Sequence, residues 1–361
     1  MKRIFLLLLL VVGFCGPLAA KSPAARDREL IDRAVQWQIR NFTDSLLPKG
    51  HWANGALYRG MAEWAAESGD ESVWTFLRGI GETCDWDMLE RVYDADDLCI
   101  GQTYLLLAGR YGNPAMATKV RERVRYVMAH PDTNPLITPK GKYYRDRWGW
   151  CDALFMAPPV YAQLAQCDGR ADYLDFCFSE FKVTTDALFS FEDGLFHRDL
   201  RLVNDREKNG EKVFWGRGNG WVYAGLALLL QYVPENHLSY AYYLDLFRRM
   251  SPAILRCQDA KGSWHAGMYD PQSWPQPENS ASGFFVYGFA WGVNNGILTD
   301  PAYRKAAVKG WKALKSHVQK DGKLGYVQPI GHDPAHVTAE MTAPYGVGAF
   351  LLAAAEMMRM K

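Results

Sequence analysis

Asp152 is the carboxyl group whose sequence surroundings best suit acid catalysis. It lies in the stretch WGWCDALFMAPPVY, residues 148–161, between tryptophans and an apolar helical run. Removal of water disfavours the ionised form of a carboxyl group, and a nearby helix N-terminus opposes this by only about 0.3–1 kcal/mol. We therefore expect a proton donor at Asp152, with Trp148 beside it in a sugar site. The alternative is an aspartate that only caps its helix.

A second carboxyl group is expected from Asp96 or Asp97, which follow Asp94 at the start of another helical pattern. Successive helix residues point about 100° apart, so only one of the two can face the same space as Asp152. Two carboxyl groups that face a common space form the arrangement used for acid and base catalysis on sugars. The pattern leaves open which of the two aspartates takes part.

The heptapeptide WGRGNGW, residues 215–221, is dense in glycine at the entrance to a helix. It is not a phosphate loop, because a tryptophan takes the place of the third glycine of GxGxxG and no GK[ST] follows. Its glycines allow Arg217, Asn219 and Trp221 to project into a binding site, where Arg217 offers a planar fork to a carboxylate. A plain capping loop is the alternative.

Two long segments without helical period, 131–147 and 192–214, are expected to form short hairpins or excursions at the mouth of the same site. They carry the polar residues Lys142, Tyr143, His197 and Arg198. Loops of this kind in a compact domain are more often functional than idle. His197 is suited to bonding a sugar hydroxyl or a carboxylate, although a lone histidine is more often structural.

The sequence predicts no metal and no organic cofactor. His332 and His336 have the i, i+4 spacing of a helical metal pair, but Pro334 lies between them and no HExxH motif occurs. A GxSxG elbow and a cysteine-protease signature are also missing from the sequence.

Hydrophobic periodicity and its stop signals predict a nearly all-helical chain. The expected helices span residues 26–42, 52–68, 71–82, 95–110, 114–130, 149–167, 170–188, 218–232, 237–255, 279–296, 300–318 and 341–359.

These twelve helices alternate in character. The odd members are amphipathic and charged, which is typical of an outer layer, whereas the even members are apolar on all sides and rich in Gly and Ala. Such alternation predicts an all-α fold, the (α/α)6 barrel or six-hairpin toroid. Its six inner helices then run in one direction, so that their N-termini deliver polar and aromatic residues, Tyr345 among them, to one mouth.

Composition narrows the class of partner. The formal net charge is +1, which gives no electrostatic case for binding nucleic acid or an anionic membrane. Aromatic residues make up 14% of the chain, and their rings suit carbohydrate binding as flat apolar platforms with a polar edge. Six cysteines follow residue 20, at spacings that predict at most one or two disulfides.

Residues 1–20 have the pattern of a secretory signal peptide: two basic residues, a short apolar run and a small-residue end. The apolar run is too short to span a membrane, and no transmembrane segment is expected after it. Cys15 as a lipoprotein cysteine is the less favoured alternative, because bulky Phe14 precedes it. The expected product is residues 21–361, a soluble exported, periplasmic chain that forms a single catalytic domain.

The assembled motifs resemble those of glycoside hydrolase family 105, the unsaturated rhamnogalacturonyl hydrolases, and less closely the unsaturated glucuronyl hydrolases of family 88. The resemblance covers nearly the whole chain after residue 20. It is carried by WCDALFMAPP at 150–159, WGRGNGW at 215–221, ENSAS at 278–282 and YGVGAF at 345–350. The families' (α/α)6 barrel agrees with the helical pattern.

The resemblance implies hydration of a double bond. Such enzymes act on oligosaccharides left by polysaccharide lyases, whose terminal uronic acid carries a C4=C5 bond. Asp152 matches the family's general acid and base, and Asp96 fits the second aspartate better than Asp97. Arg217 and Trp221 match residues that hold the substrate, with the uronate carboxylate as the partner of Arg217.

His197 and Lys142 also fall at family binding positions. The expected substrate is Δ-galacturonyl-rhamnose from pectic rhamnogalacturonan, with fragments of arabinogalactan, ulvan or glycosaminoglycan as alternatives. A polysaccharide lyase and a sugar-binding protein without catalysis are the rival functions. The oligomeric state, monomer or homo-oligomer, is not predicted by the sequence.

Overall fold

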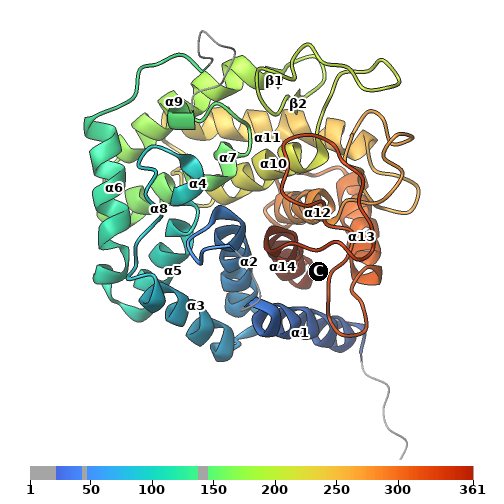
Figure 1. The fold of residues 1–361 in the computed structure, drawn as a ribbon, viewed down its shortest axis with the longest axis horizontal. Helices are drawn as coiled ribbons and strands as arrows, with labels where there is room; N and C mark the ends of the chain where they lie inside the picture. Colours follow the sequence, from blue (N-terminus) through green and yellow to red (C-terminus); the bar gives the residue numbers. More distant parts are fainter. Residues whose placement is uncertain (1–21, 43–46, 137–144, 361) are drawn as a thin grey trace, which may run out of the picture.

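The computed structural model describes residues 22–42, 47–136 and 145–360. Its helices form two concentric rings, with the outer ring surrounding the inner one in Figure 1. The predicted all-α (α/α)6 barrel is confirmed. The outer helices are α1 (Pro23–Asn41), α3 (Glu71–Thr83), α6 (Thr118–Ala129), α9 (Asp172–Leu188), α11 (Leu238–Arg256) and α13 (Pro301–Ser316).

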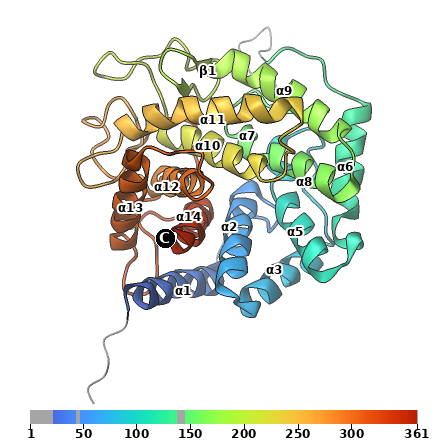
Figure 2. The same cartoon turned by 180° about the vertical axis from the view of Figure 1, so that it is seen from behind.

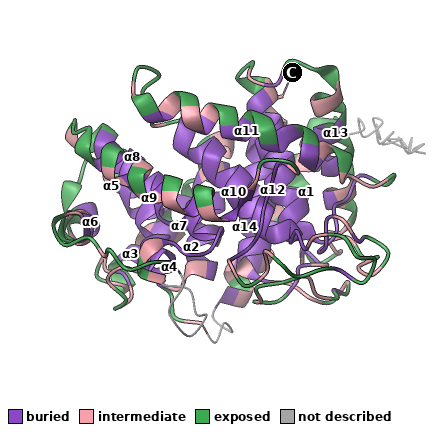
Figure 3. Ribbon diagram, turned by 90° about the horizontal axis from the view of Figure 1, so that it is seen from above, coloured by how far each residue is buried: buried purple, intermediate pink, exposed green. Residues whose placement is uncertain are grey.

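The inner ring consists of α2 (Trp52–Ser68), α4 (Ala95–Leu98) with α5 (Gly101–Tyr111), α7 (Ala153–Met156) with α8 (Pro158–Asp168), α10 (Gly216–Leu230), α12 (Asn279–Asn294) and α14 (Pro344–Arg359). Each inner member contacts the next, and α14 returns to α2, so the ring closes. Figure 3 shows the consequence, since α10, α12 and α14 are buried on all sides while α11 and α13 expose one face.

Two of the predicted inner helices are broken in the structure. The span 149–167 begins only at Ala153 and is interrupted at Ala157, because Pro158 and Pro159 lack the N–H groups that would continue its hydrogen bonds. The amide of Gln102 donates to the Phe155 carbonyl at 2.8 Å and so satisfies an acceptor that the prolines leave without a helical partner. The span 95–110 is likewise divided between Leu98 and Gly101.

Smaller deviations occur at the ends of elements. The predicted helix 341–359 begins at Pro344, whose fixed φ suits a first helical position, and the helix predicted at 114–130 opens with a 3₁₀ turn, Pro114–Ala117. Another 3₁₀ turn covers Arg145–Arg147. After α9 the chain forms a short antiparallel pair, β1 (Phe189–Ser190) and β2 (Leu195–Phe196), and β2 lies in the segment 192–214 where short hairpins were expected.

Small residues allow the ring to close between its first and last inner helices. A Cβ added to Gly60 of α2 would lie 2.2 Å from the Gly348 carbonyl oxygen, and one added to Gly348 of α14 would lie 2.3 Å from that of Ala56. The two backbones therefore pass at a distance that no side chain permits. The all-round Gly and Ala content of the inner helices is the sequence signal for this packing.

Ion pairs join the same two helices at the end away from the α2 N-terminus. Buried Arg59 donates to Glu63 at 2.8 Å, and Arg359 of α14 donates to Glu63 at 2.9 Å and to Glu67 at 2.7 Å. Burial alone would raise the pKa of Glu63, but the two guanidinium groups lower it below its ordinary value. Figure 2 shows α14 beside α2 from this rear side.

The six cysteines within the described residues form no disulfide: Cys84, Cys99, Cys151, Cys167, Cys177 and Cys257 are free. Among the described residues, no helix combines the length and apolar character needed to cross a membrane.

Glycine-to-alanine substitutions should distinguish the effect of close helix packing on stability from the effect of helix propensity. We expect Gly348→Ala to lower the free energy of unfolding by about 1–3 kcal/mol, because its methyl group overlaps the backbone of α2. Gly79→Ala in α3 is the control, since nothing lies within 4 Å of its added Cβ, and it should stabilise by about 0.5–1 kcal/mol. Urea denaturation measures both; equal effects would contradict the packing argument.

Candidate active site

A pocket of about 440 Å³ opens where the N-termini of the inner helices α2, α4 and α7 meet the segments 198–201 and 330–332. Its wall contains two carboxyl groups, three arginines and several apolar side chains. The lining residues are Trp52, Asp96, Arg145, Trp150, Asp152, Met156, Arg198, Arg201, Ile330, Gly331 and His332.

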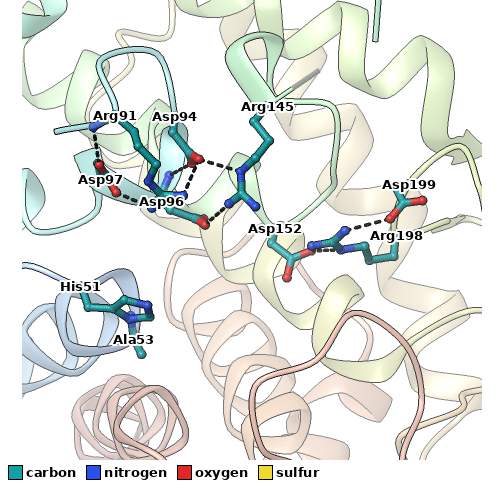
Figure 4. Close-up of polar contacts among 10 residues, drawn as sticks. All are labelled: His51, Ala53, Arg91, Asp94, Asp96, Asp97, Arg145, Asp152, Arg198 and Asp199. Carbon is teal, nitrogen blue, oxygen red and sulfur yellow. Dashed lines mark hydrogen bonds and ion pairs between the residues drawn. The ribbon is translucent and has the colours of Figure 1, made fainter. Parts of the chain in front are cut away.

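Asp152 occupies the N-cap position of α7, yet its side chain makes no capping hydrogen bond. The carboxyl group instead faces the pocket, where Arg198 Nε lies 3.4 Å from Oδ2 (Figure 4). The Cys151 thiol donates to the same oxygen at 3.5 Å. The capping alternative is therefore wrong for this side chain, which is buried, held by an arginine and directed at a ligand space.

Asp96 is the second carboxyl group of the pocket. Asp94 caps α4 by accepting the Asp96 N–H at 3.0 Å, which fixes the first turn. Arg145 bridges the two, donating from Nε to Asp94 and from Nη2 to Asp96, both at 2.6 Å. Burial, reinforced by Asp94 and Asp152, raises the pKa of Asp96 to about 7 despite Arg145. The site therefore retains a protonated carboxyl group up to neutral pH.

Asp97 points away from this pocket. It is fully buried and accepts hydrogen bonds from the backbone N–H and the guanidinium group of Arg91 (Figure 4). The structure thus separates the two adjacent aspartates as helix geometry requires. Asp96 lies in the pocket, and Asp97 anchors the chain before α4.

Arg198 and Arg201 approach from the opposite wall. Arg198 was expected in a loop at this mouth without a ligand role, and Arg201 was not expected. Asp199 holds both: its carboxylate accepts from Arg198 at 2.8 Å and from Arg201 at 2.9 and 2.7 Å. A bridge between Trp150 and Asp199 places this segment against Asp152.

His197 does lie on the other side. It is buried against the Phe214 ring, with centroids 4.7 Å apart, and does not line the pocket. Burial, together with nearby Lys212, lowers its pKa. Trp148 also packs behind the wall, against Tyr161. Lys142 lies outside the described residues.

The heptapeptide 215–221 forms the first part of α10 and supports the pocket from behind. Arg217 is fully buried and donates to the carbonyls of Gln328 at 2.7 Å and Pro329 at 3.0 Å. Asn219 joins β2 to α10 by exchanging hydrogen bonds with the Phe196 backbone at 2.8 and 3.0 Å. Neither side chain lines the pocket, so the structure gives each a bracing contact where a ligand contact was expected.

Aromatic rings form a layer beneath the pocket. Trp52 lines it and stacks on Tyr345, with centroids 5.3 Å apart and planes inclined by 24°. Trp221 packs on the edge of Trp52 and on Phe155 and is completely buried. The layer begins at His51, whose Nδ1 accepts the Ala53 N–H at 3.2 Å and caps α2 (Figure 4). Of the expected aromatic ligands, Tyr345 and Trp221 therefore contact Trp52 from below.

An (α/α)6 barrel whose mouth holds two buried carboxyl groups and an aromatic floor defines the chain as a glycoside hydrolase of the helical-barrel class. The family model described as Glycosyl Hydrolase Family 88 matches residues 30–361. The chain belongs to this family.

Relatives of assigned function are similar over nearly the full length. A protein of Alteromonas sp. (strain LOR), named unsaturated 3S-rhamnoglycuronyl hydrolase, is 37% identical over 348 residues, covering 91% of this chain and 84% of the relative. A Formosa agariphila protein of the same name is 33% identical, covering 91% and 89%.

Solved structures share the fold closely. A family 88 glycosyl hydrolase from Bacteroides vulgatus has a TM-score of 0.85 at 29% identity, covering 94% of this chain and 100% of that one. A structure described as a polysaccharide lyase has the same TM-score at 31% identity, covering 94% and 98%.

Substitution of the adjacent aspartates should change stability in opposite directions. The pKa of Asp96 is raised, so its contribution to stability is fully present below about pH 4 and is lost as pH rises through about 7. We expect Asp96→Asn to raise Tm at pH 8 by about 2 °C or more, with the difference vanishing near pH 4.

Asp97→Asn is the matched control, because it removes the carboxylate that accepts both Arg91 donors. It should lower Tm at pH 8. Thermal unfolding across this pH range measures both variants, and a lower Tm for Asp96→Asn at pH 8 would contradict the buried-acid argument.

Proposed function

We propose that this enzyme removes a C4=C5-unsaturated uronic acid from the rhamnose to which it is joined, at the non-reducing end of lyase-generated oligosaccharides. The observation that carries the proposal is the pocket itself, where Asp96 and Asp152 lie together and each is held by its own arginine. Membership of family 88 and the names of the two relatives support the same reaction.

The bond that reacts is a vinyl ether, in which the ring oxygen pushes electrons toward C4. An acid adds a proton at C4 and is left as a carboxylate. Water then adds to the cation at C5 and gives up a proton to that same carboxylate of the enzyme. The hemiketal opens, and the hemiacetal so formed at C1 expels the neighbouring sugar. We assign the proton transfers to Asp152, whose carboxyl group is buried, unused as a cap and directed into the pocket.

Asp96 is the group that stays protonated to neutral pH, and we assign it the role of a hydrogen-bond donor to the substrate. One of its oxygens is taken by Arg145, which leaves the other to carry the proton. A neutral neighbour also avoids a second negative charge when Asp152 is left as a carboxylate by the proton transfer.

The substrate carboxylate needs a cation within the pocket. Arg217 was the expected partner, but its guanidinium group is buried and donates to two backbone carbonyls. We assign the role to Arg201, whose side chain is 43% exposed and which lines the pocket. Asp199 holds its guanidinium plane by two hydrogen bonds, so the group is oriented before substrate arrives.

The unsaturated residue by itself does not identify the parent polysaccharide. Formation of the C4=C5 bond removes the stereochemistry at C4, so galacturonic and glucuronic acid give the same unsaturated sugar. Discrimination between pectic rhamnogalacturonan, the expected source, and a sulfated rhamnoglycuronan depends on the linkage and on substituents of the rhamnose. The relatives' names favour rhamnose carrying a 3-sulfate.

We further propose that residues 1–20 are a signal peptide, that 21–361 form one catalytic domain and that the enzyme works in the periplasm. The amino-terminal pattern of basic, apolar and small residues supports export.

Asp152→Asn should abolish turnover while binding survives. We expect kcat to fall by about 10²–10⁴-fold, because the amide has no proton to donate at C4. The measurement is the loss of double-bond ultraviolet absorbance from unsaturated uronyl-rhamnose disaccharides with and without the 3-sulfate, with binding followed by calorimetry. Wild-type enzyme that consumes no member of this panel would refute the proposed function.

A lyase is the second candidate, favoured by the similar structure described as one. The two reactions change the absorbance in opposite directions, since a lyase creates the double bond that a hydrolase consumes. Incubation with an intact uronic-acid polysaccharide should therefore produce no absorbance, whereas a gain that Asp152→Asn abolishes would replace the hydrolase assignment.

The pH profile of kcat/KM should fall at its alkaline side because of Asp96. Burial raises its pKa to about 7, so the carboxyl group loses its proton as pH rises through that value and ceases to donate a hydrogen bond. We expect the alkaline limb to disappear in Asp96→Asn, whose activity is lower but whose amide still donates. Persistence of the limb near pH 7 in this variant would exclude Asp96 as its origin.

A further inference from the structure

The segment 328–333, between α13 and α14, is held in place by the contacts of one residue, Gln328. Gln328 is 1% exposed, and its backbone N–H donates to Glu278 at 3.0 Å while its carbonyl accepts from Arg217 and from the Tyr345 hydroxyl. Its side-chain oxygen accepts from Trp215 at 3.0 Å, and its amide donates to the Asp333 carbonyl at 2.8 Å. Every polar group of Gln328 is therefore engaged.

This anchoring presents the next residues to the pocket in a defined position. Ile330, Gly331 and His332 line the pocket, and the chain that carries them passes over the ends of the inner helices in Figure 1. The anchor comes from three other segments of the ring, at 215–217, 278 and 345. Residues 330–332 thus form a wall whose place is set by the barrel.

Ile330 is unusual in this wall because it is apolar and 54% exposed. Of the large hydrophobic residues exposed in the described part of the chain, it alone lines the pocket. Of the other apolar lining residues, Trp150 and Met156 are each 1% exposed and lie at depth, whereas Trp52 is half-buried. A single exposed isoleucine is ordinary on a surface, but here it stands at the outer edge of a charged pocket on a braced segment.

The burial of the two pocket aspartates indicates which sugar of the proposed substrate lies deep in the pocket and which lies near its rim. The reacting uronyl group must reach Asp96 and Asp152, which are buried, so the leaving sugar lies toward the exposed rim that includes Ile330. Rhamnose is a 6-deoxy sugar, and its C6 methyl group is the most apolar part of its surface. Other candidate leaving sugars carry a hydroxymethyl or carboxylate group at the same position.

We propose that Ile330 selects the leaving sugar by packing against the C6 methyl group of rhamnose. This proposal rests on the proposed function and adds the residue that reads the neighbouring sugar. An apolar contact rewards a methyl group, whereas a hydroxyl placed against it loses water without gaining a hydrogen bond. Discrimination of roughly 10-fold in kcat/KM is the size that one such contact supplies.

Two substrates test the contact directly. Unsaturated uronyl-L-rhamnose is compared with unsaturated uronyl-L-mannose of the same linkage, because L-mannose differs from L-rhamnose only by a hydroxyl on C6. Wild-type enzyme should prefer rhamnose by roughly 10-fold in kcat/KM. Ile330→Asn should reduce the preference to less than about twofold, by losing activity on rhamnose, while Ile330→Val should retain most of it.

Val308→Asn is the matched control, since Val308 is 50% exposed on α13 and does not line the pocket. It should leave the preference unchanged. An Ile330→Asn variant that loses the same factor on both substrates, or on neither, would overturn the inference. Wild-type enzyme that consumes both without preference would also overturn it but leave the proposed function standing, whereas consumption of neither would refute both.

Discussion

The site depends on keeping several carboxyl groups together in a place that excludes water. Asp96 and Asp152 line one pocket and Asp94 lies beside Asp96, so their mutual repulsion would oppose folding without compensation. Arg145 joins Asp94 to Asp96, and Arg198 joins Asp152 to Asp199. Each guanidinium group thus pairs a pocket carboxyl group with a structural one, and the remaining excess of negative charge is removed by a proton on Asp96.

The barrel supplies this arrangement through the direction of its inner helices. α4 and α7 begin at the same mouth, so the residues at their first turns face each other although 55 positions separate Asp96 from Asp152 in the sequence. Close passage of Gly60 against Gly348 closes the ring that holds those helices in place. Close backbone packing along the inner helices therefore fixes the positions of the site residues at their N-termini.

The motif at 215–221 shows how a distinctive sequence can serve a site without touching its ligand. Arg217 and Asn219 bond to backbone carbonyls and amides of segments 328–329 and 196, and both are buried. A substitution there would disturb the pocket through the segments it holds. The motif can therefore resemble the family's substrate-holding sequence although its side chains contact other segments of the protein. Its glycines let α10 approach its neighbours closely.

The sequence by itself determined the architecture, because alternation of charged and all-round apolar helices leaves few other ways to bury the inner set. It also pointed to Asp152 and to Asp96 or Asp97 as candidate acids, since local periodicity is carried by neighbouring residues. Only the tertiary structure placed Asp96, and not Asp97, in the pocket with Asp152, and only it brought Arg145, Arg198 and Ile330 there. These side chains come from loops without periodicity, whose direction is set by contacts with distant segments such as Gln328 and Asp199, and no local pattern records such contacts.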